Sequence, residues 1–164
     1  MQNLSDALKK SEEGDVMFDS FSRGRYATDA SLYQMKPVGV MSPKSEDDIA
    51  AAIDIAAQQG GPLLARGGGT SQCGQTVNNA LVLDNTQYFN DILELDVEGM
   101  RCVVRPGIVL DELNRALKPH GLWYPVDVST ASRATIGGMT ANNSSGGKTL
   151  RNGLMRDNVL SIDA

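Results

Sequence analysis

A glycine-rich stretch, ARGGGTSQCGQ at residues 65–75, decides the fold expected for this chain. Its three consecutive glycines are separated by Arg66 alone from residues 62–65, which the pattern of apolar residues predicts to be a strand. Residues 60–74 and a second stretch, residues 137–153, together hold 11 of the 17 glycines. Because glycine is useful mainly where φ is positive or where another group approaches the main chain, two tight loops are implied.

The residues before the first loop predict the start of a βαβ unit. Residues 38–41 form a short apolar run. Ser45 is expected to cap a helix that ends at Gln59, with Asp48 three positions after the cap. With the strand at residues 62–65, the order becomes strand, helix, strand.

The residues after the first loop predict three more strands and a helix. The strands are expected at residues 81–83, 92–95 and 101–105, and the helix at residues 109–117. Glu98 and Gly99 would form the turn of a hairpin between the last two strands. Pro119 and Gly121 would end the helix.

Composition favours one globular domain preceded by a polar segment. We expect an N-terminal arm at residues 1–36, with a helix-like stretch at residues 4–10, and a domain at residues 37–164. The net charge of −5 argues against a broad surface for nucleic acid or anionic lipid.

A cytoplasmic location is expected from the polar start of the chain and its two cysteines. Cys73 and Cys102 are expected to be free thiols, because no leader directs the chain to an oxidising compartment. No apolar run approaches the roughly 20 residues of a membrane span.

The first loop has the composition of a pyrophosphate-binding turn. Backbone amides that converge after a strand can hold phosphate oxygens, and Thr70 and Ser71 could add hydroxyl donors. A dinucleotide fingerprint is disfavoured, because its third glycine would fall at Gln72. A turn that only reverses the chain is the open alternative.

The second loop contains Gly147, Lys148 and Thr149, which suggest a nucleoside triphosphate site. The phosphate-binding pattern also requires a glycine where this chain has Asn142, and a buried strand just upstream. Nucleoside triphosphate binding is therefore kept as a minor alternative.

Six short motifs in order carry a resemblance to a known family. They are RGGGTS at 66–71, NNALVLD at 78–84, VRPG at 104–107, PVDVS at 125–129, ATIGGM at 134–139 and NNSSG at 142–146. In this order they resemble the FAD-binding domain of the vanillyl-alcohol oxidase family, also called the para-cresol methylhydroxylase (PCMH) type. Residues 30–164 are particularly similar to the FAD-linked D-lactate dehydrogenase, glycolate oxidase and D-2-hydroxyglutarate dehydrogenase group.

The resemblance implies an α+β fold: a PCMH-type FAD-binding domain with an N-terminal βαβ-containing subdomain and the start of a second α/β subdomain. It also implies that two segments grip opposite sides of one extended FAD. The pyrophosphate would be faced by Arg66, Gly67, Gly68, Gly69, Thr70 and Ser71, with Gly74 and Gln75 completing the turn. Pro106 would line the adenine side, and the stretch toward the flavin ring would be lined by Asp127, Ser129, Thr135, Gly137, Gly138, Asn142, Ser144 and Gly146. For Arg66 the sequence leaves open whether it meets the diphosphate, pairs with a carboxylate or points to solvent.

Non-covalent FAD is expected, because this chain departs from relatives that tether their flavin. Those relatives can carry histidine directly after the glycine loop, whereas this chain has Gly69 and then Thr70. Its one histidine, His120, is expected to have a surface role, and no metal site is expected. A flavin link through Cys73 is a less favoured alternative.

The resemblance implies hydride transfer from a D-2-hydroxy acid to FAD in a longer flavoenzyme, of which this chain would be an N-terminal piece. A strand at residues 159–164 would lead into the rest of the domain. No catalytic residue is assigned, and the chain alone is expected to be inactive. Its partners would be the small hydroxy acid and an electron acceptor in the full-length protein. A flavin-binding electron-transfer or scaffold module of the same fold is the alternative.

Overall fold

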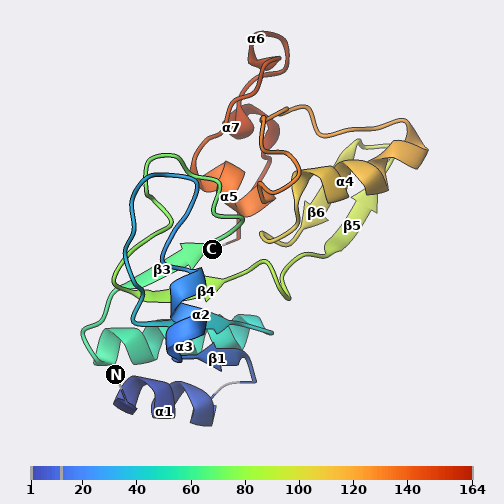
Figure 1. Cartoon of the computed structure of the whole chain (residues 1–164). Coiled ribbons are helices and arrows are strands. Elements are labelled where there is room, and N and C mark those ends of the chain that lie inside the picture. Colours follow the sequence, from blue (N-terminus) through green and yellow to red (C-terminus); the bar gives the residue numbers. More distant parts are fainter. Residues whose placement is uncertain (1, 12, 164) are drawn as a thin grey trace. The chain divides into compact units, whose positions relative to one another are not determined.

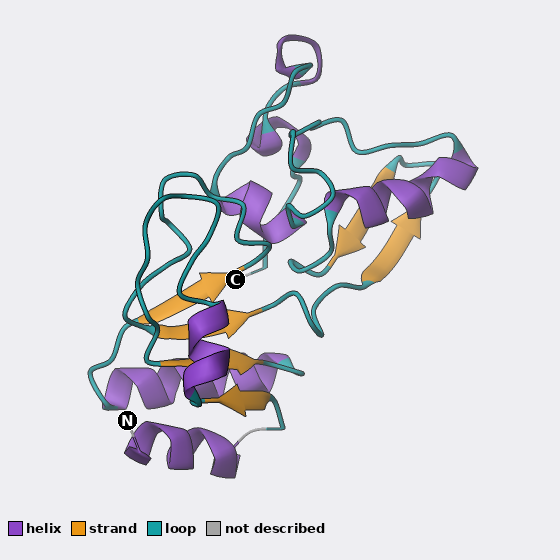
Figure 2. Ribbon diagram, in the orientation of Figure 1, coloured by secondary structure: helices purple, strands orange, loops and turns teal. Residues whose placement is uncertain are grey.

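The computed structural model describes residues 2–11 and 13–163, which divide into two compact units. Unit 1 ends at Phe89 and unit 2 begins at Asn90. Figure 1 labels most of the helices and strands of both units, and Figure 2 distinguishes helices, strands and loops by colour. No helix among the described residues is long and apolar enough to cross a membrane.

Unit 1 is built on a four-stranded sheet with the order β1-β2-β4-β3. Its strands are β1 (Asp15–Met17), β2 (Gly39–Ser42), β3 (Leu63–Arg66) and β4 (Leu81–Asp84), and its helices are α1 (Gln2–Ser11), α2 (Ser20–Arg25) and α3 (Glu46–Gln58). Strands β2 and β3 both pair with β4 in parallel, and β1 pairs with β2 in antiparallel. The expected βαβ unit, β2-α3-β3, is therefore confirmed, with β4 between its two strands. Every residue of β2 and β4 is buried, as expected for central strands covered on both faces.

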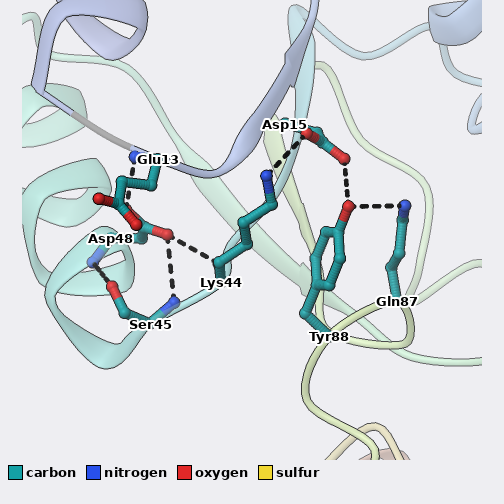
Figure 3. Close-up of polar contacts among 7 residues, drawn as sticks. All are labelled: Glu13, Asp15, Lys44, Ser45, Asp48, Gln87 and Tyr88. Carbon is teal, nitrogen blue, oxygen red and sulfur yellow. Dashed lines mark hydrogen bonds and ion pairs between the residues drawn. The ribbon is translucent and has the colours of Figure 1, made fainter.

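The start of α3 is fixed by Asp48, as the sequence predicts. The Ser45 hydroxyl oxygen accepts the Asp48 amide, and the Asp48 carboxylate accepts the Ser45 amide, which makes a capping box. The same carboxylate accepts the amides of Glu13 at 3.1 Å and Lys44 at 2.7 Å (Figure 3). One buried carboxylate thus ties the chain before β1 to the start of α3.

The polar segment expected as an arm contributes to unit 1. Strand β1 pairs with β2, and α1 packs against α3, with the Leu8 side chain fully buried. Figure 3 shows that Asp15 of β1 also accepts a hydrogen bond from the Tyr88 hydroxyl and pairs with Lys44. The boundary at residue 37 between an arm and a cofactor-binding domain stays a prediction.

Unit 2 combines a two-stranded hairpin with one longer helix and several short ones. The strands are β5 (Ile92–Asp96) and β6 (Arg101–Val104), and the helices are α4 (Leu110–Leu117), the 3-10 helix η1 (Lys118–His120), α5 (Ile136–Ala141), α6 (Thr149–Asn152) and α7 (Met155–Asn158). The predicted hairpin is confirmed: β5 and β6 are antiparallel, and the Gly99 amide donates to the Asp96 carboxylate at 2.8 Å in the turn. Helix α4 buries Leu110, Leu113 and Leu117 in the core of unit 2, and Gly121 ends η1 in the left-handed conformation.

Two further predictions are settled by the structure. Cys73 and Cys102 are free cysteines, as expected. The strand expected at residues 159–164 is wrong for its described part, since residues 159–163 belong to no strand. The cause is pairing: none of the described residues forms a ladder with them, and Leu160 and Ile162 are exposed.

Candidate cofactor-binding site

The glycine loop of unit 1 begins where β3 ends. Parallel strands β3 and β4 place the loop at a carboxyl end of the sheet, the edge at which ligands bind in open α/β sheets. Gly69 has φ +64° and Gly74 has φ +76°, so both positions favour glycine. A Cβ atom would lie 2.7 Å from Arg66 Nη2 at Gly69 and 2.7 Å from Tyr33 Cδ2 at Gly74. The loop is therefore a tightly packed turn, as the glycine content implies.

The hydrogen bonds of Arg66 go to main-chain oxygens, which the sequence did not predict. Its Nη1 atom donates to the carbonyl oxygens of Tyr26 at 3.2 Å and Thr76 at 2.9 Å. Its Nη2 atom donates to the carbonyl oxygen of Thr28 at 2.8 Å. Burial lowers the pKa of the guanidinium. Arg66 thus joins the beginning and the end of the loop to the segment that follows α2.

The segment that follows α2 lines the loop, and sequence analysis missed it. In Figure 1 the two loops run side by side, and the Ala30 amide donates to the Gly69 carbonyl oxygen at 3.0 Å. The Thr76 hydroxyl donates to Asp29 at 2.8 Å. Burial alone would raise the pKa of Asp29, but hydrogen bonds from Ser31 and Thr76 outweigh it and lower the pKa. The sequence carries no signal for these contacts, because the partners lie about 40 residues apart in a polar stretch.

The remaining loop positions carry the polar groups that sequence analysis expected. Thr70 and Ser71 are partly buried. The Ser71 hydroxyl donates to the side-chain oxygen of Gln75, and its oxygen accepts the Cys73 amide at 3.2 Å. Gly67 lies in the same turn and is partly buried, whereas Gly68 is exposed. These contacts tie Ser71, Cys73 and Gln75 together within the loop that holds all the expected pyrophosphate residues.

In unit 2 the structure brings Pro106 and Gly137 together. The Gly137 amide donates to the Pro106 carbonyl oxygen at 2.8 Å, and a Cβ atom at Gly137 would lie 2.5 Å from Pro106 Cβ. The two motifs VRPG and ATIGGM, about 30 residues apart, are therefore packed against each other. Glycine is needed at 137 for close approach and not for a positive φ.

The next expected residues form the two ends of α5. Thr135 is buried, and its hydroxyl oxygen accepts the Gly138 amide at 3.3 Å as the N-cap. Asn142 ends the helix, and its amide donates to the Gly138 carbonyl oxygen at 3.1 Å. Ser144 follows and donates its amide to the Met139 carbonyl oxygen at 2.9 Å. A cavity of about 400 Å³ lies nearby, lined in part by Thr140, Asn143 and Arg156.

Asp127 and Gly146 also come together. A Cβ atom at Gly146 would lie 2.3 Å from the Asp127 carboxylate and 2.6 Å from its main chain. The Lys148 amide donates to the same carboxylate at 3.0 Å. Ser129, two residues after Asp127, is exposed. The motifs PVDVS and NNSSG thus share one packed turn.

The contacts of Lys148 and Thr149 do not favour a nucleoside triphosphate loop. The Lys148 ammonium lies 5.1 Å from the centre of the Trp123 ring. The Thr149 hydroxyl bonds within its own turn, accepting the Gly146 amide at 2.8 Å. Helix α6 has four residues, too short to resemble the helix that follows such a loop.

The expected cofactor residues therefore form one packed loop in unit 1 and a set of packed turns in unit 2. That both sets meet one ligand stays a prediction. His120, expected at the surface, is exposed.

Comparisons with known proteins agree with the resemblance seen in the motifs. The family model described as FAD binding domain matches residues 37–164. D-2-hydroxyglutarate dehydrogenase of Pseudomonas putida is 38% identical over 161 residues, which cover 96% of this chain and 16% of that protein. The glycolate oxidase subunit GlcD of Bacillus subtilis is 36% identical over 155 residues, which cover 92% of this chain and 33% of that protein. The chain thus spans about a sixth of the length of the first of these relatives.

Solved structures show the same fold at low identity. An alkyldihydroxyacetonephosphate synthase superposes with a TM-score of 0.85 at 22% identity, covering 98% of this chain and 32% of that one. The 6-hydroxy-D-nicotine oxidase of Arthrobacter nicotinovorans superposes with a TM-score of 0.77 at 23% identity, covering 90% of this chain and 32% of that one. Both matches are evidence for the fold alone.

Proposed function

Because this chain belongs to the FAD binding domain family, we propose that it forms the FAD-binding portion of a flavoenzyme that oxidises D-2-hydroxy acids. The PCMH-type fold and the resemblance to the vanillyl-alcohol oxidase family are confirmed. The observation that carries the proposal is the family match over residues 37–164, together with the relatives named D-2-hydroxyglutarate dehydrogenase and glycolate oxidase.

The residues of the glycine loop fit the pyrophosphate of FAD. The turn leaves no room for a Cβ at Gly69 or Gly74, and a left-handed residue in a turn is typical of backbone sites that hold anions. Residues 67–71 would supply main-chain amides and the Thr70 hydroxyl to the phosphates. In unit 2, Asp127, Thr135 and the turns around them would line the remainder of the cofactor. FAD supplies the hydride acceptor when it is bound.

The contribution of this chain is cofactor placement. Main-chain amides and hydroxyl dipoles fixed by the packed turns stabilise the phosphate charge without a cluster of cations, which suits a chain with net charge −5. We assign no catalytic base here. The activity belongs to the parent polypeptide, by which we mean the natural polypeptide that carries these residues, and the chain alone is expected not to turn over substrate.

A dissociable FAD and a cytoplasmic location complete the proposal. Thr70, not histidine, follows the glycines, and both cysteines are free thiols, which suits a reducing compartment. Acid precipitation of the parent polypeptide is expected to release the yellow colour into the supernatant. Colour retained in the pellet would contradict a dissociable cofactor.

The test is an assay of the parent polypeptide with an artificial dye as electron acceptor. We expect flavin absorbance in the purified protein and dye reduction with at least one D-2-hydroxy acid but not with its L-enantiomer. Flavin without turnover on any hydroxy acid would favour an electron-transfer or scaffold module. Absence of flavin uptake would overturn the proposal.

A further inference from the structure

The Arg66 guanidinium is directed at the main chain of the loop and its neighbour. Three hydrogen bonds of 2.8–3.2 Å run from Nη1 and Nη2 to the carbonyl oxygens of Tyr26, Thr28 and Thr76. A guanidinium has five N–H donors in a fixed planar arrangement, and three of the five are used in these main-chain hydrogen bonds. The guanidinium also lies over the Tyr26 ring, 5.3 Å from its centre.

Two carboxylates, those of Asp29 and Asp84, act on the same guanidinium as opposite charges. Asp84 is held in place by the Tyr26 hydroxyl, which donates to it at 2.5 Å, and Asp29 by the Thr76 hydroxyl at 2.8 Å. Opposite charges that already act on Arg66 reduce its attraction for a phosphate group.

The bonds of Arg66 close the loop geometrically. Arg66 begins the loop, Thr76 ends it, and Tyr26 and Thr28 belong to the segment beside it. Gly69 packs against the guanidinium so closely that a Cβ would lie 2.7 Å from Nη2. The shape of the turn at residues 67–75 therefore depends on the position of the Arg66 guanidinium.

We propose that Arg66 is a positioning residue, which holds the loop at residues 67–75 in the shape that receives the FAD pyrophosphate and does not act as the cation that neutralises it. This rests on the proposed function, in which that loop binds FAD. The ammonium of a flexible lysine side chain cannot make the three hydrogen bonds that the planar guanidinium makes. Lysine at position 66 is therefore expected not to restore the shape of the loop.

The test compares FAD affinity in four forms of the parent polypeptide: wild type, Arg66→Lys, Arg66→Met and the control Arg25→Lys. Arg25 is exposed and lies 6.0 Å from the centre of the same Tyr26 ring. Titration of the apoprotein with FAD is expected to give a Kd raised roughly tenfold or more in both Arg66 variants, because hydrogen bonds from a charged group are lost in each. The dependence of Kd on salt concentration is expected to stay as in wild type, and Arg25→Lys to bind as wild type does.

Two outcomes would overturn the proposal. If Arg66→Lys binds FAD like wild type while Arg66→Met binds weakly with a flatter salt dependence, Arg66 is a cationic ligand of the phosphate. If neither variant differs from Arg25→Lys, the guanidinium has no role in binding. Should the Arg66 variants not fold, the wild type alone still tests the proposal, because Arg66 is the one cationic residue in residues 65–75. A Kd for FAD that rises steeply with salt concentration would indicate that this cation contacts the phosphates and would contradict the proposal.

Hydrogen exchange in the apoprotein separates this proposal from the proposed function. Arg66→Lys is expected to speed amide exchange at residues 67–75 and not in the rest of unit 1, which a general loss of stability would not do. This measurement needs no FAD. A wild-type protein that binds no FAD would contradict the proposed function. Unchanged amide exchange at residues 67–75 in Arg66→Lys would contradict only the role proposed for Arg66.

Discussion

Glycine serves two different purposes among the residues expected to meet the cofactor. Gly69 and Gly74 have positive φ values, so their conformations disfavour other residues. Gly137 and Gly146 are needed because another main chain lies against them, that of Pro106 and that of Asp127. The first purpose shapes a loop, and the second lets distant motifs pack together.

Gly146 allows a direct test of close approach, because its neighbour Gly147 is a matched control. A Cβ at Gly146 would lie 2.3 Å from the Asp127 carboxylate, whereas the nearest atom to a Cβ at Gly147 is 3.8 Å away. Gly146→Ala is expected to lower the free energy of unfolding of unit 2 by about 1–3 kcal/mol, the cost of overpacking. Gly147→Ala is expected to change it by less than about 0.5 kcal/mol.

Urea unfolding followed by the fluorescence of Trp123, the one tryptophan, measures both variants in unit 2. Equal effects of the two substitutions would show that Asp127 does not restrict position 146.

Tyr124 is expected to make unit 2 sensitive to alkaline pH. Burial, with a smaller contribution from Cys102, raises its pKa from 10.0 to about 12. The fold therefore favours the neutral phenol, which donates to Met155 Sδ at 3.5 Å. Its contribution to stability is complete below pH 10, where the unfolded phenol is also neutral, and is lost as the pH rises toward 12.

Trp123 fluorescence at a series of pH values checks this expectation. The free energy of unfolding of the wild type should fall more steeply between pH 10 and 12 than that of Tyr124→Phe. Parallel curves for the two proteins would mean that Tyr124 ionises equally in the folded and unfolded states.

At the scale of elements, α1 is expected to stabilise unit 1 in spite of its polar sequence. Leu8 is fully buried where α1 packs on α3, while Ile53 of α3 is half exposed. Leu8→Ala is expected to cost roughly 2–5 kcal/mol of unfolding free energy, and Ile53→Ala less than about 1 kcal/mol. Circular dichroism and hydrogen exchange in unit 1 report both changes. If the two variants lose equal stability, residues 1–36 behave as a loosely attached arm.

Local signals predicted the elements between residues 37 and 121 well, but not β1, α2 or the short helices α5, α6 and α7. The Ser45 and Asp48 cap, the hairpin turn at Glu98 and Gly99, and the end at Gly121 of the helical segment formed by α4 and η1 each depend on residues a few positions apart. The hydrogen bonds and backbone conformations of such short segments are determined by the residues within them. The structure therefore confirms these predictions nearly residue by residue.

Long-range pairing could not be predicted in the same way. Nothing local indicates that β4 inserts between β2 and β3, because strand order depends on residues far apart in the chain. The partners of Arg66 were missed for the same reason, since Tyr26 and Thr28 lie in a polar segment with no periodic pattern. The strand expected at residues 159–164 needs a pairing partner, which local sequence cannot supply.

At the scale of the whole molecule, the two glycine-rich segments fall in different units. The loop at residues 67–75 belongs to unit 1, and the turns from Gly137 to Gly146 belong to unit 2. Each segment is packed by contacts within its own unit. In the proposed function both segments contact one FAD, which would couple the two units when the cofactor binds.

Amide hydrogen exchange of the parent polypeptide with and without FAD tests this coupling most directly. We expect FAD to slow exchange at residues 67–75 and at residues 137–146 over the same range of FAD concentration, because one ligand orders both segments. Protection confined to one segment, or protection of the two segments at clearly different FAD concentrations, would contradict a single cofactor held by both units.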